Sequence, residues 1–145
     1  MTAGDAGAPP VRIGVLGAAR IVRQALLDPA GPLDGVDVTT VAARDEARAR
    51  EYASKHSIRH VHGSYEELLA DPAVDAVYIP LPGSLHADWT IAAIDAGKHV
   101  LTEKPFTSNA PDAERVAERA ATGDIVVMEP YQTHFHPLQE RLREI

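Results

Sequence analysis

The chain has 145 residues, of which 45% are hydrophobic and 24% are charged, a composition typical of a soluble globular protein. Its formal net charge of −7 argues against a surface that binds nucleic acid or an anionic membrane. The absence of cysteine excludes disulfide and thiolate chemistry. We expect a cytoplasmic protein with a disordered tail at 1–10, because this Gly-, Ala- and Pro-rich start lacks the features of a signal peptide. No apolar run is long enough to predict a membrane span.

Short apolar runs alternate with longer amphipathic runs along the chain, which is the pattern of strands that alternate with helices. In chain order we expect strands at 11–17, 36–44, 59–63, 74–80, 98–103 and 124–129. We expect helices at 18–28, after Asp45, at 64–70, 84–97 and 109–121, and the start of a last helix at 137–145.

Local start signals and stop signals support these helices. Asp45 can cap the helix behind the second strand, and Ser64 with Glu67 has the spacing of a capping box. Gly97 is suited to end the helix at 84–97.

The predicted strands contain almost no polar residues in alternation, so both faces of their sheet should be buried. Strands of this kind, each followed by a helix, predict a parallel sheet with helices on both sides. We therefore predict an α/β fold with a doubly wound parallel sheet, a three-layer α/β/α Rossmann domain over 11–130.

In such a sheet a ligand binds where the first helix begins. The first turn matches the dinucleotide motif G-x-G-x-x-G/A imperfectly, with Gly17 in the first place, Ala19 in the second and Val22 in the third. Gly17 allows the tight turn, whereas Ala19 adds a methyl group near a pyrophosphate and Val22 is bulky for close packing. The alternative is an ordinary turn without a ligand. The motif nevertheless lies between the first strand and the first helix, and this position favours a dinucleotide site. The predicted contacts are Gly17, Ala18, Ala19, Arg20 and Ile21.

The residue that selects between NAD and NADP should follow the second strand. Ala43 stands where an acid would select NAD, and Arg44 comes next. A guanidinium binds phosphate through paired hydrogen bonds, so Arg44 favours the 2′-phosphate of NADP. Asp45 could instead contact the ribose hydroxyls of NAD if the register shifts, although helix capping is the simpler role. NADP is therefore the preferred cofactor, and NAD stays open.

The second half of the chain contains more specific motifs. Residues 96–101 read AGKHVL and are followed by Glu103-Lys104-Pro105; residues 82–86 have the pattern P-x-S-x-H, and 127–137 contain VMEPY and FHP. With these motifs the chain resembles the nucleotide-binding half of the Gfo/Idh/MocA oxidoreductases, which include glucose–fructose oxidoreductase, inositol dehydrogenase and dihydrodiol dehydrogenase. The resemblance runs from about Val11 to Pro137.

The resemblance implies roles for individual residues. Lys104 would be the catalytic lysine near the nicotinamide, where an ammonium can polarise the reacting oxygen and shuttle a proton. Glu103 would help to hold the cofactor, and Pro105 would turn the two preceding side chains apart. The loop after the fourth strand would lie along the cofactor with Pro80, Leu81, Pro82, Ser84 and His86.

Simpler explanations exist for several of these residues. The Glu-Lys-Pro sequence could be a solvated pair before a turn proline, and His86 could cap or pack. His60 with His62, and His134 with His136, repeat one spacing, but no suitably placed carboxylate or cysteine partners are evident, so we predict no metal site.

Besides Ala19 and Val22 in the glycine motif, two residues depart from the family pattern, Gly83 where asparagine is frequent and His134 where arginine is frequent. From the resemblance we expect the family's second α/β domain, which walls the active site and supplies an aspartate and a histidine, to be missing, and 131–145 to begin the connection to it. The usual sheet for homo-oligomer formation would be missing with it.

The resemblance implies an NAD(P)-dependent oxidoreductase that transfers hydride at a CH–OH group of a sugar, cyclitol or diol. A small-molecule substrate, rather than nucleic acid or membrane, is the expected partner. The alternatives are a dinucleotide-binding module without turnover and a remnant without a ligand.

Overall fold

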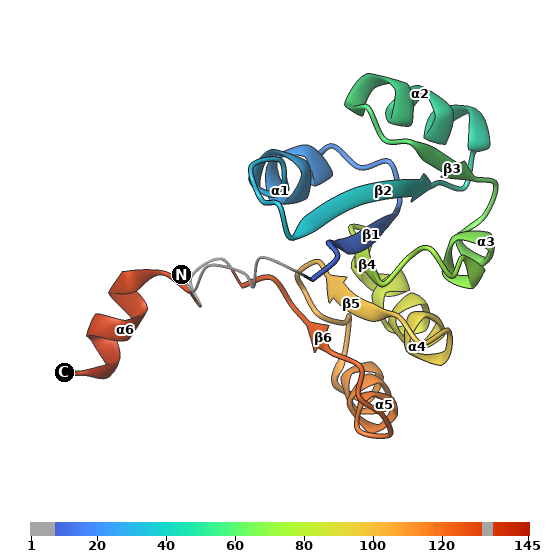
Figure 1. Ribbon diagram of the computed structural model, residues 1–145. Coiled ribbons are helices and arrows are strands. Elements are labelled where there is room, and N and C mark those ends of the chain that lie inside the picture. The colour runs from blue at the N-terminus through green and yellow to red at the C-terminus, as the bar shows by residue number, and fades with distance from the viewer. Residues whose placement is uncertain (1–7, 132–134) are drawn as a thin grey trace.

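The computed structural model describes residues 8–131 and 135–145. Six strands form one parallel sheet in the order β3-β2-β1-β4-β5-β6 (Figure 1). The strands are β1 (Val11–Leu16), β2 (Val36–Ala42), β3 (His60–His62), β4 (Ala76–Ile79), β5 (His99–Thr102) and β6 (Val127–Met128). The chain runs outward from β1 in one direction and then, from β4, in the other. This is the predicted doubly wound sheet, and its topological switch point lies between β1 and β4.

Helices follow the strands as expected. They are the π-helical turn η1 (Arg23–Leu27), α1 (Asp28–Ala30), α2 (Glu46–His56), α3 (Tyr65–Ala70), the 3-10 turn η2 (Gly83–Leu85), α4 (His86–Asp95), α5 (Ala110–Ala120) and α6 (Pro137–Arg143). The first helical stretch runs on to Ala30, beyond the predicted end at residue 28. None of the helices in the described part of the chain is long and apolar enough to cross a membrane.

Two hydrophobic clusters cover the two faces of the sheet. Neighbouring residues of β4 point to opposite faces, since Val77 and Ile79 join one cluster and Tyr78 joins the other. The first cluster receives side chains from α3, α4 and α5, and the second receives them from η1 and α2. The three-layer arrangement expected from the apolar strands is therefore confirmed.

The predicted helix caps at Asp45 and Ser64 form, and the capping box at Ser64 differs from the expected pattern in one hydrogen bond. Asp45 Oδ1 accepts from the backbone N–H groups of Ala47 and Arg48 at 2.9 and 3.3 Å. Ser64 Oγ accepts from Glu67 N at 3.1 Å, as in a capping box. The reciprocal bond is displaced by one residue, because the Glu67 carboxylate accepts from Gly63 N rather than from Ser64 N.

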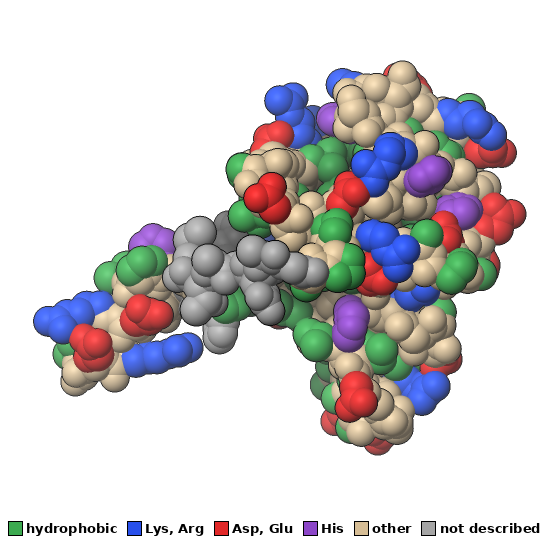
Figure 2. All heavy atoms as spheres, viewed as in Figure 1, with side chains coloured by type: hydrophobic (Ala, Val, Ile, Leu, Met, Phe, Trp, Pro, Cys, Tyr) green, Lys and Arg blue, Asp and Glu red, His purple; other side chains and the backbone are tan. Residues whose placement is uncertain are grey.

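All six strands are shorter than predicted, and the differences at β2 and β6 concern the ligand edge and the outer edge of the sheet. β2 ends at Ala42, so Ala43 and Arg44 leave the sheet and are free to turn toward a ligand. β6 contains two residues because it lies at the edge of the sheet and pairs only with Val100 and Leu101 of β5. On the face seen in Figure 2, acidic and basic side chains are interspersed over the sheet domain.

The Asp75 carboxylate ties the loop before β4 to β1. It accepts from Arg12 N and Nε at 2.9 Å and from Nη2 at 2.7 Å. These hydrogen bonds lower the pKa of Asp75 from 3.8 to about 2. Because the pKa is depressed in the folded state, this stabilisation is present above pH 3.8 and is lost as the pH falls toward 2.

We therefore expect Asp75→Asn to be less stable than the wild type at neutral pH, and the difference to disappear near pH 2. The effect should be small, because the two side chains are 40% and 37% exposed and solvent screens their attraction. Urea unfolding at several pH values measures it. A difference that persists below pH 2 would contradict this explanation.

Candidate functional site

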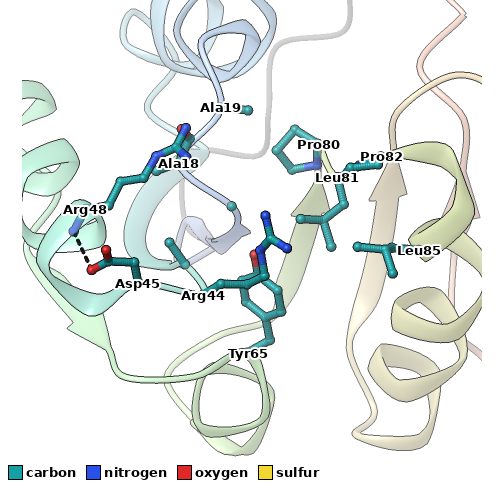
Figure 3. A pocket seen from close by; sticks show the side chains of 12 residues that line it. Ala18, Ala19, Arg44, Asp45, Arg48, Tyr65, Pro80, Leu81, Pro82 and Leu85 are labelled. Carbon is teal, nitrogen blue, oxygen red and sulfur yellow. Dashed lines mark hydrogen bonds between the residues drawn. The ribbon is translucent and has the colours of Figure 1, made fainter.

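The main cleft lies at the carboxyl edge of the sheet and has a volume of about 550 Å³. Binding sites for small molecules and cofactors usually measure roughly 300–1,000 Å³. Its walls come from the loops after β1, β2 and β4 and from the start of α3 (Figure 3). The cleft therefore opens at the switch point of the sheet, where a doubly wound fold binds its ligand.

The turn after β1 forms the floor of the main cleft with Gly17, Ala18 and Ala19. Gly17 has a φ of 124°, a conformation that side chains other than glycine rarely adopt. A Cβ atom at Gly17 would lie 3.1 Å from Leu81 Cδ2, across the cleft. This glycine therefore leaves room for a ligand to approach the backbone. Val22, the bulky third position of the motif, is fully buried in the core beside Leu26.

Two arginines line the main cleft beyond β2. Arg44 extends from the loop, and Arg48 lies in the first turn of α2 (Figure 3). Arg48 Nη2 donates to the carbonyl oxygen of Ala18 at 3.1 Å, which holds this guanidinium against the floor. Asp45 also lines the cleft, but its Oδ1 is used by the α2 cap. The cleft thus presents two cations and one carboxylate that already accepts two hydrogen bonds.

The opposite wall is apolar. Pro80, Leu81, Pro82 and Leu85 come from the loop between β4 and α4. Tyr65 closes this side from the start of α3.

Tyr65 is buried, and its ring packs edge to face against Trp89 with 4.8 Å between ring centroids. Burial raises the pKa of the Tyr65 hydroxyl, while the nearby positive charge of Arg44 acts in the other direction. The phenol is therefore neutral at physiological pH, and the ring is fixed by its packing.

The main cleft brings together part of the predicted site. The predicted residues that line it are Gly17, Ala18, Ala19, Arg44, Pro80, Leu81 and Pro82. Arg48, Tyr65 and Leu85 also line it and were not identified from the sequence. Arg48 could have been found, because the first turn of the helix after β2 faces the same edge of the sheet as Arg44.

The other predicted residues lie outside the walls of the main cleft. Arg20 lines a neighbouring hollow, and Ile21 is 40% exposed at the start of the first helical stretch. Ser84 is exposed in η2. Their contacts with a cofactor remain predictions, as do those of His86, Glu103 and Lys104.

His86 joins two loops beneath the site. Its side chain is 1% exposed. Nδ1 lies 2.7 Å from the carbonyl oxygen of Pro105, and Nε2 lies 2.7 Å from that of Leu81. The ring therefore braces the end of β4 against the loop that carries Lys104, which agrees with the simpler packing role considered for it.

Glu103 and Lys104 follow β5 but do not pair with each other. Glu103 Oε1 accepts from the Tyr78 hydroxyl at 2.6 Å, and Oε2 accepts from the backbone N–H of Lys104 at 3.2 Å. Within the described residues the Lys104 ammonium forms no ion pair, and its side chain is exposed. Because β1, β4 and β5 are parallel neighbours, Gly17 and Lys104 lie at the same edge of the sheet, on either side of the β4 loop.

A Tyr78→Phe variant should lose the bond that orients Glu103. Burial raises the pKa of Tyr78, and the hydrogen bond to Glu103 raises it further, so the hydroxyl stays a donor. Removing a buried bond to a charged group should lower the free energy of unfolding by roughly 1.5–3 kcal/mol in urea. Tyr52→Phe is the control, since its hydroxyl donates to the neutral carbonyl of Ala19 and should cost roughly 0.5–1.5 kcal/mol. Equal losses would show that the Glu103 carboxylate adds nothing.

The histidines do not build a metal centre in the part of the chain that the structure describes, where no group of three metal-ligating side chains occurs. His62 Nε2 instead lies 2.9 Å from the Asp71 carboxylate. His134 lies outside the described residues.

The known proteins that this chain is similar to are oxidoreductases. A family model described as an oxidoreductase family with an NAD-binding Rossmann fold matches residues 11–131. D-xylose 1-dehydrogenase (NADP(+)) 2 of Haloferax volcanii is 45% identical over 132 residues, which cover 91% of this chain and 40% of the relative. Human trans-1,2-dihydrobenzene-1,2-diol dehydrogenase is 41% identical over 108 residues, 74% of this chain and 32% of that protein.

Among solved structures, KijD10, a 3-ketoreductase from Actinomadura kijaniata in complex with NADP, superimposes with a TM-score of 0.84 at 38% identity. The match covers 93% of this chain and 43% of that one. The chain thus spans about 40% of the length of the first curated relatives it matches. On its fold, its cleft and these matches, the chain belongs to the Gfo/Idh/MocA oxidoreductase family, whose NAD-binding Rossmann fold it carries over residues 11–131.

Proposed function

We propose that this chain is the NADP-binding part of an oxidoreductase that transfers hydride at a CH–OH group of a sugar, cyclitol or diol. The main cleft carries the proposal, because it combines a glycine turn open to close approach with two guanidinium groups on one wall. An apolar wall on the other side is suited to the faces of a nucleotide base.

NADP fits this cleft better than NAD does. A 2′-phosphate needs cationic donors beyond β2, and Arg44 and Arg48 are both there. Asp45 also lines the cleft, but its Oδ1 accepts from the backbone N–H groups of the α2 cap, and the two arginines outnumber this carboxylate. The relatives that are named for NADP(+) or solved with NADP support the same choice.

NADP, when bound, supplies or accepts the hydride. Lys104 is the residue of this chain that we assign to the reacting oxygen, where an ammonium can stabilise negative charge and move a proton. Glu103 accepts from Tyr78 and, in the described part of the chain, forms no ion pair with that ammonium. His86 holds the loop that carries Lys104 against the end of β4.

A second candidate is a dinucleotide-binding module without turnover. Lys104 is exposed and does not line the main cleft, while hydride transfer needs a substrate held still and shielded from water. The chain also spans only about 40% of its curated relatives. These observations favour a chain that contributes the nucleotide site and one side of a substrate site.

A measurement of turnover distinguishes the oxidoreductase from the binding module. The wild-type chain is mixed with NADP⁺ and a panel of a pentose, a cyclitol and a trans-diol, and the appearance of reduced nicotinamide is followed by absorbance. For an oxidoreductase, Lys104→Ala should reduce the rate by at least about 100-fold while NADPH affinity stays within about twofold. Lys104→Arg, which keeps the charge but removes the titratable amine, should not restore the rate.

Absence of turnover in the wild type, with NADPH binding that survives Lys104→Ala, would assign the binding module. Failure of the wild type to bind NADPH would overturn both candidates.

A further inference from the structure

A second hollow of about 370 Å³ lies beside the main cleft, between the first helical stretch and α2. It shares Ala18 and Arg48 with the main cleft, whereas its other lining residues do not line the main cleft. We call it the basic hollow, because Arg20, Arg23, Arg48 and Lys55 line it.

The positive charge of the basic hollow is largely uncompensated. Glu51 is the single carboxylate in its lining, although the chain as a whole carries a net charge of −7. Arg20 and Lys55 form no ion pair with any residue in 8–131 or 135–145. Arg23 Nε lies 3.5 Å from Asp28, but the two side chains are 66% and 62% exposed, so their attraction is screened. A concave surface with this charge attracts anions.

The positive charges of the basic hollow affect the pKa of His56, which also lines it. His56 packs against Tyr52 with 4.3 Å between ring centroids. Burial lowers the pKa of His56, and the charges of Lys55 and Arg23 lower it further against a smaller opposing effect of Asp28. The cations that a bound anion would neutralise therefore contribute, after burial, to the lowered pKa of His56.

The cations are spread too widely for a single phosphate. Arg48 and Lys55 are seven residues apart on α2, which corresponds to about 10 Å along the helix axis. Arg20 and Arg23 line the same hollow from the first helical stretch. Two or three linked phosphates can reach cations over this length, whereas an isolated phosphate reaches only one part of it.

We propose that the basic hollow is a binding site for an anion that contains two or more linked phosphate groups. The site lies next to the proposed NADP site and does not depend on it. Because both sites use Arg48, the two ligands should oppose each other when NADPH is the cofactor, since its 2′-phosphate needs the same guanidinium. NADH lacks this phosphate and should be affected much less.

Tripolyphosphate is the probe, measured by isothermal titration calorimetry on the whole 145-residue chain at constant ionic strength. Lys55→Ala and Arg23→Ala should each weaken binding by about tenfold, because each removes a charge-assisted contact. Arg50→Ala is the matched control on the same helix; Arg50 pairs with Glu46 and lies outside the hollow, so affinity should change by less than about twofold.

The protonation of His56 gives a second readout. A bound polyanion offsets the repulsion from Lys55 and Arg23, so the pKa of His56 should rise on binding. The ring proton signals of His56, followed by NMR across a pH titration with and without tripolyphosphate, report this change. Binding should also tighten as the pH falls.

Three results would overturn the proposal. The first is no saturable tripolyphosphate binding by the wild type. The second is an equal loss in Arg50→Ala and Lys55→Ala, which would indicate diffuse surface charge. The third is a loss of NADPH affinity in Lys55→Ala as large as the loss for tripolyphosphate, which would mean that the hollow holds the 2′-phosphate of the cofactor. If NADPH fails to bind while tripolyphosphate binds as described, the proposed function fails and this site stands.

Discussion

Replacing Gly17 with alanine is expected to weaken NADPH binding by at least about tenfold and to destabilise the fold by roughly 1–3 kcal/mol. The loss of stability follows from the φ of 124°, which an L side chain rarely adopts. The loss of affinity has a separate cause, because the new methyl group would lie 3.1 Å from Leu81 Cδ2 in the main cleft, where the backbone must stay open to a pyrophosphate. Fluorescence titration and urea unfolding measure the two effects.

The variant Gly97→Ala distinguishes the effect of backbone strain from the effect of a methyl group that blocks the main cleft. Gly97 also has a positive φ, 72°, but a Cβ atom there would meet nothing within 4 Å, and the residue lies after α4, away from the main cleft. This variant should lose stability and keep its NADPH affinity. An equal loss of affinity in both variants would mean that Gly17 acts only through the stability of the fold.

Replacing Arg44 with alanine should weaken NADPH binding by roughly 1–3 kcal/mol and leave NADH binding nearly unchanged. The guanidinium lines the main cleft just beyond β2, where the cofactors differ by one phosphate. Arg48→Ala should act in the same direction, since this side chain is held at the floor of the cleft by its bond to Ala18. Direct titration with each cofactor measures the difference.

Arg50→Ala on the opposite side of α2 is the control and should bind both cofactors as the wild type does. An equal loss of NADPH and NADH affinity in Arg44→Ala would show that Arg44 does not contact the 2′-phosphate. It would also reopen the alternative in which Asp45 contacts the ribose of NAD.

Much of the fold could be predicted because its signals are local. The apolar runs of β1, β4 and β5 require burial on both faces, and the caps at Asp45 and Ser64 depend on residues two or three positions away. The end of β2 and the short β6 could not be predicted, since strand length depends on the neighbouring strand.

The candidate site was predicted where a motif lies on one loop, as at Gly17 and in the residues after β4. The predicted site was incomplete where tertiary packing determines which side chains reach the cleft. Tyr65 reaches the main cleft from the start of α3, and Glu103 is oriented by Tyr78, a residue 25 positions earlier in the chain. His86 has the sequence position of a cofactor ligand, yet both ring nitrogens face backbone carbonyl groups.

Trp89 provides the most direct test of NADPH binding in the main cleft. It is the chain's one tryptophan, and it packs against Tyr65, which lines the cleft. NADPH in the cleft should quench Trp89 emission by energy transfer to the reduced nicotinamide, with a saturable response that is tighter for NADPH than for NADH. The central claim would be contradicted by no saturable quenching up to ~1 mM, the weak end of ordinary affinities, or by quenching that is unchanged in Gly17→Ala.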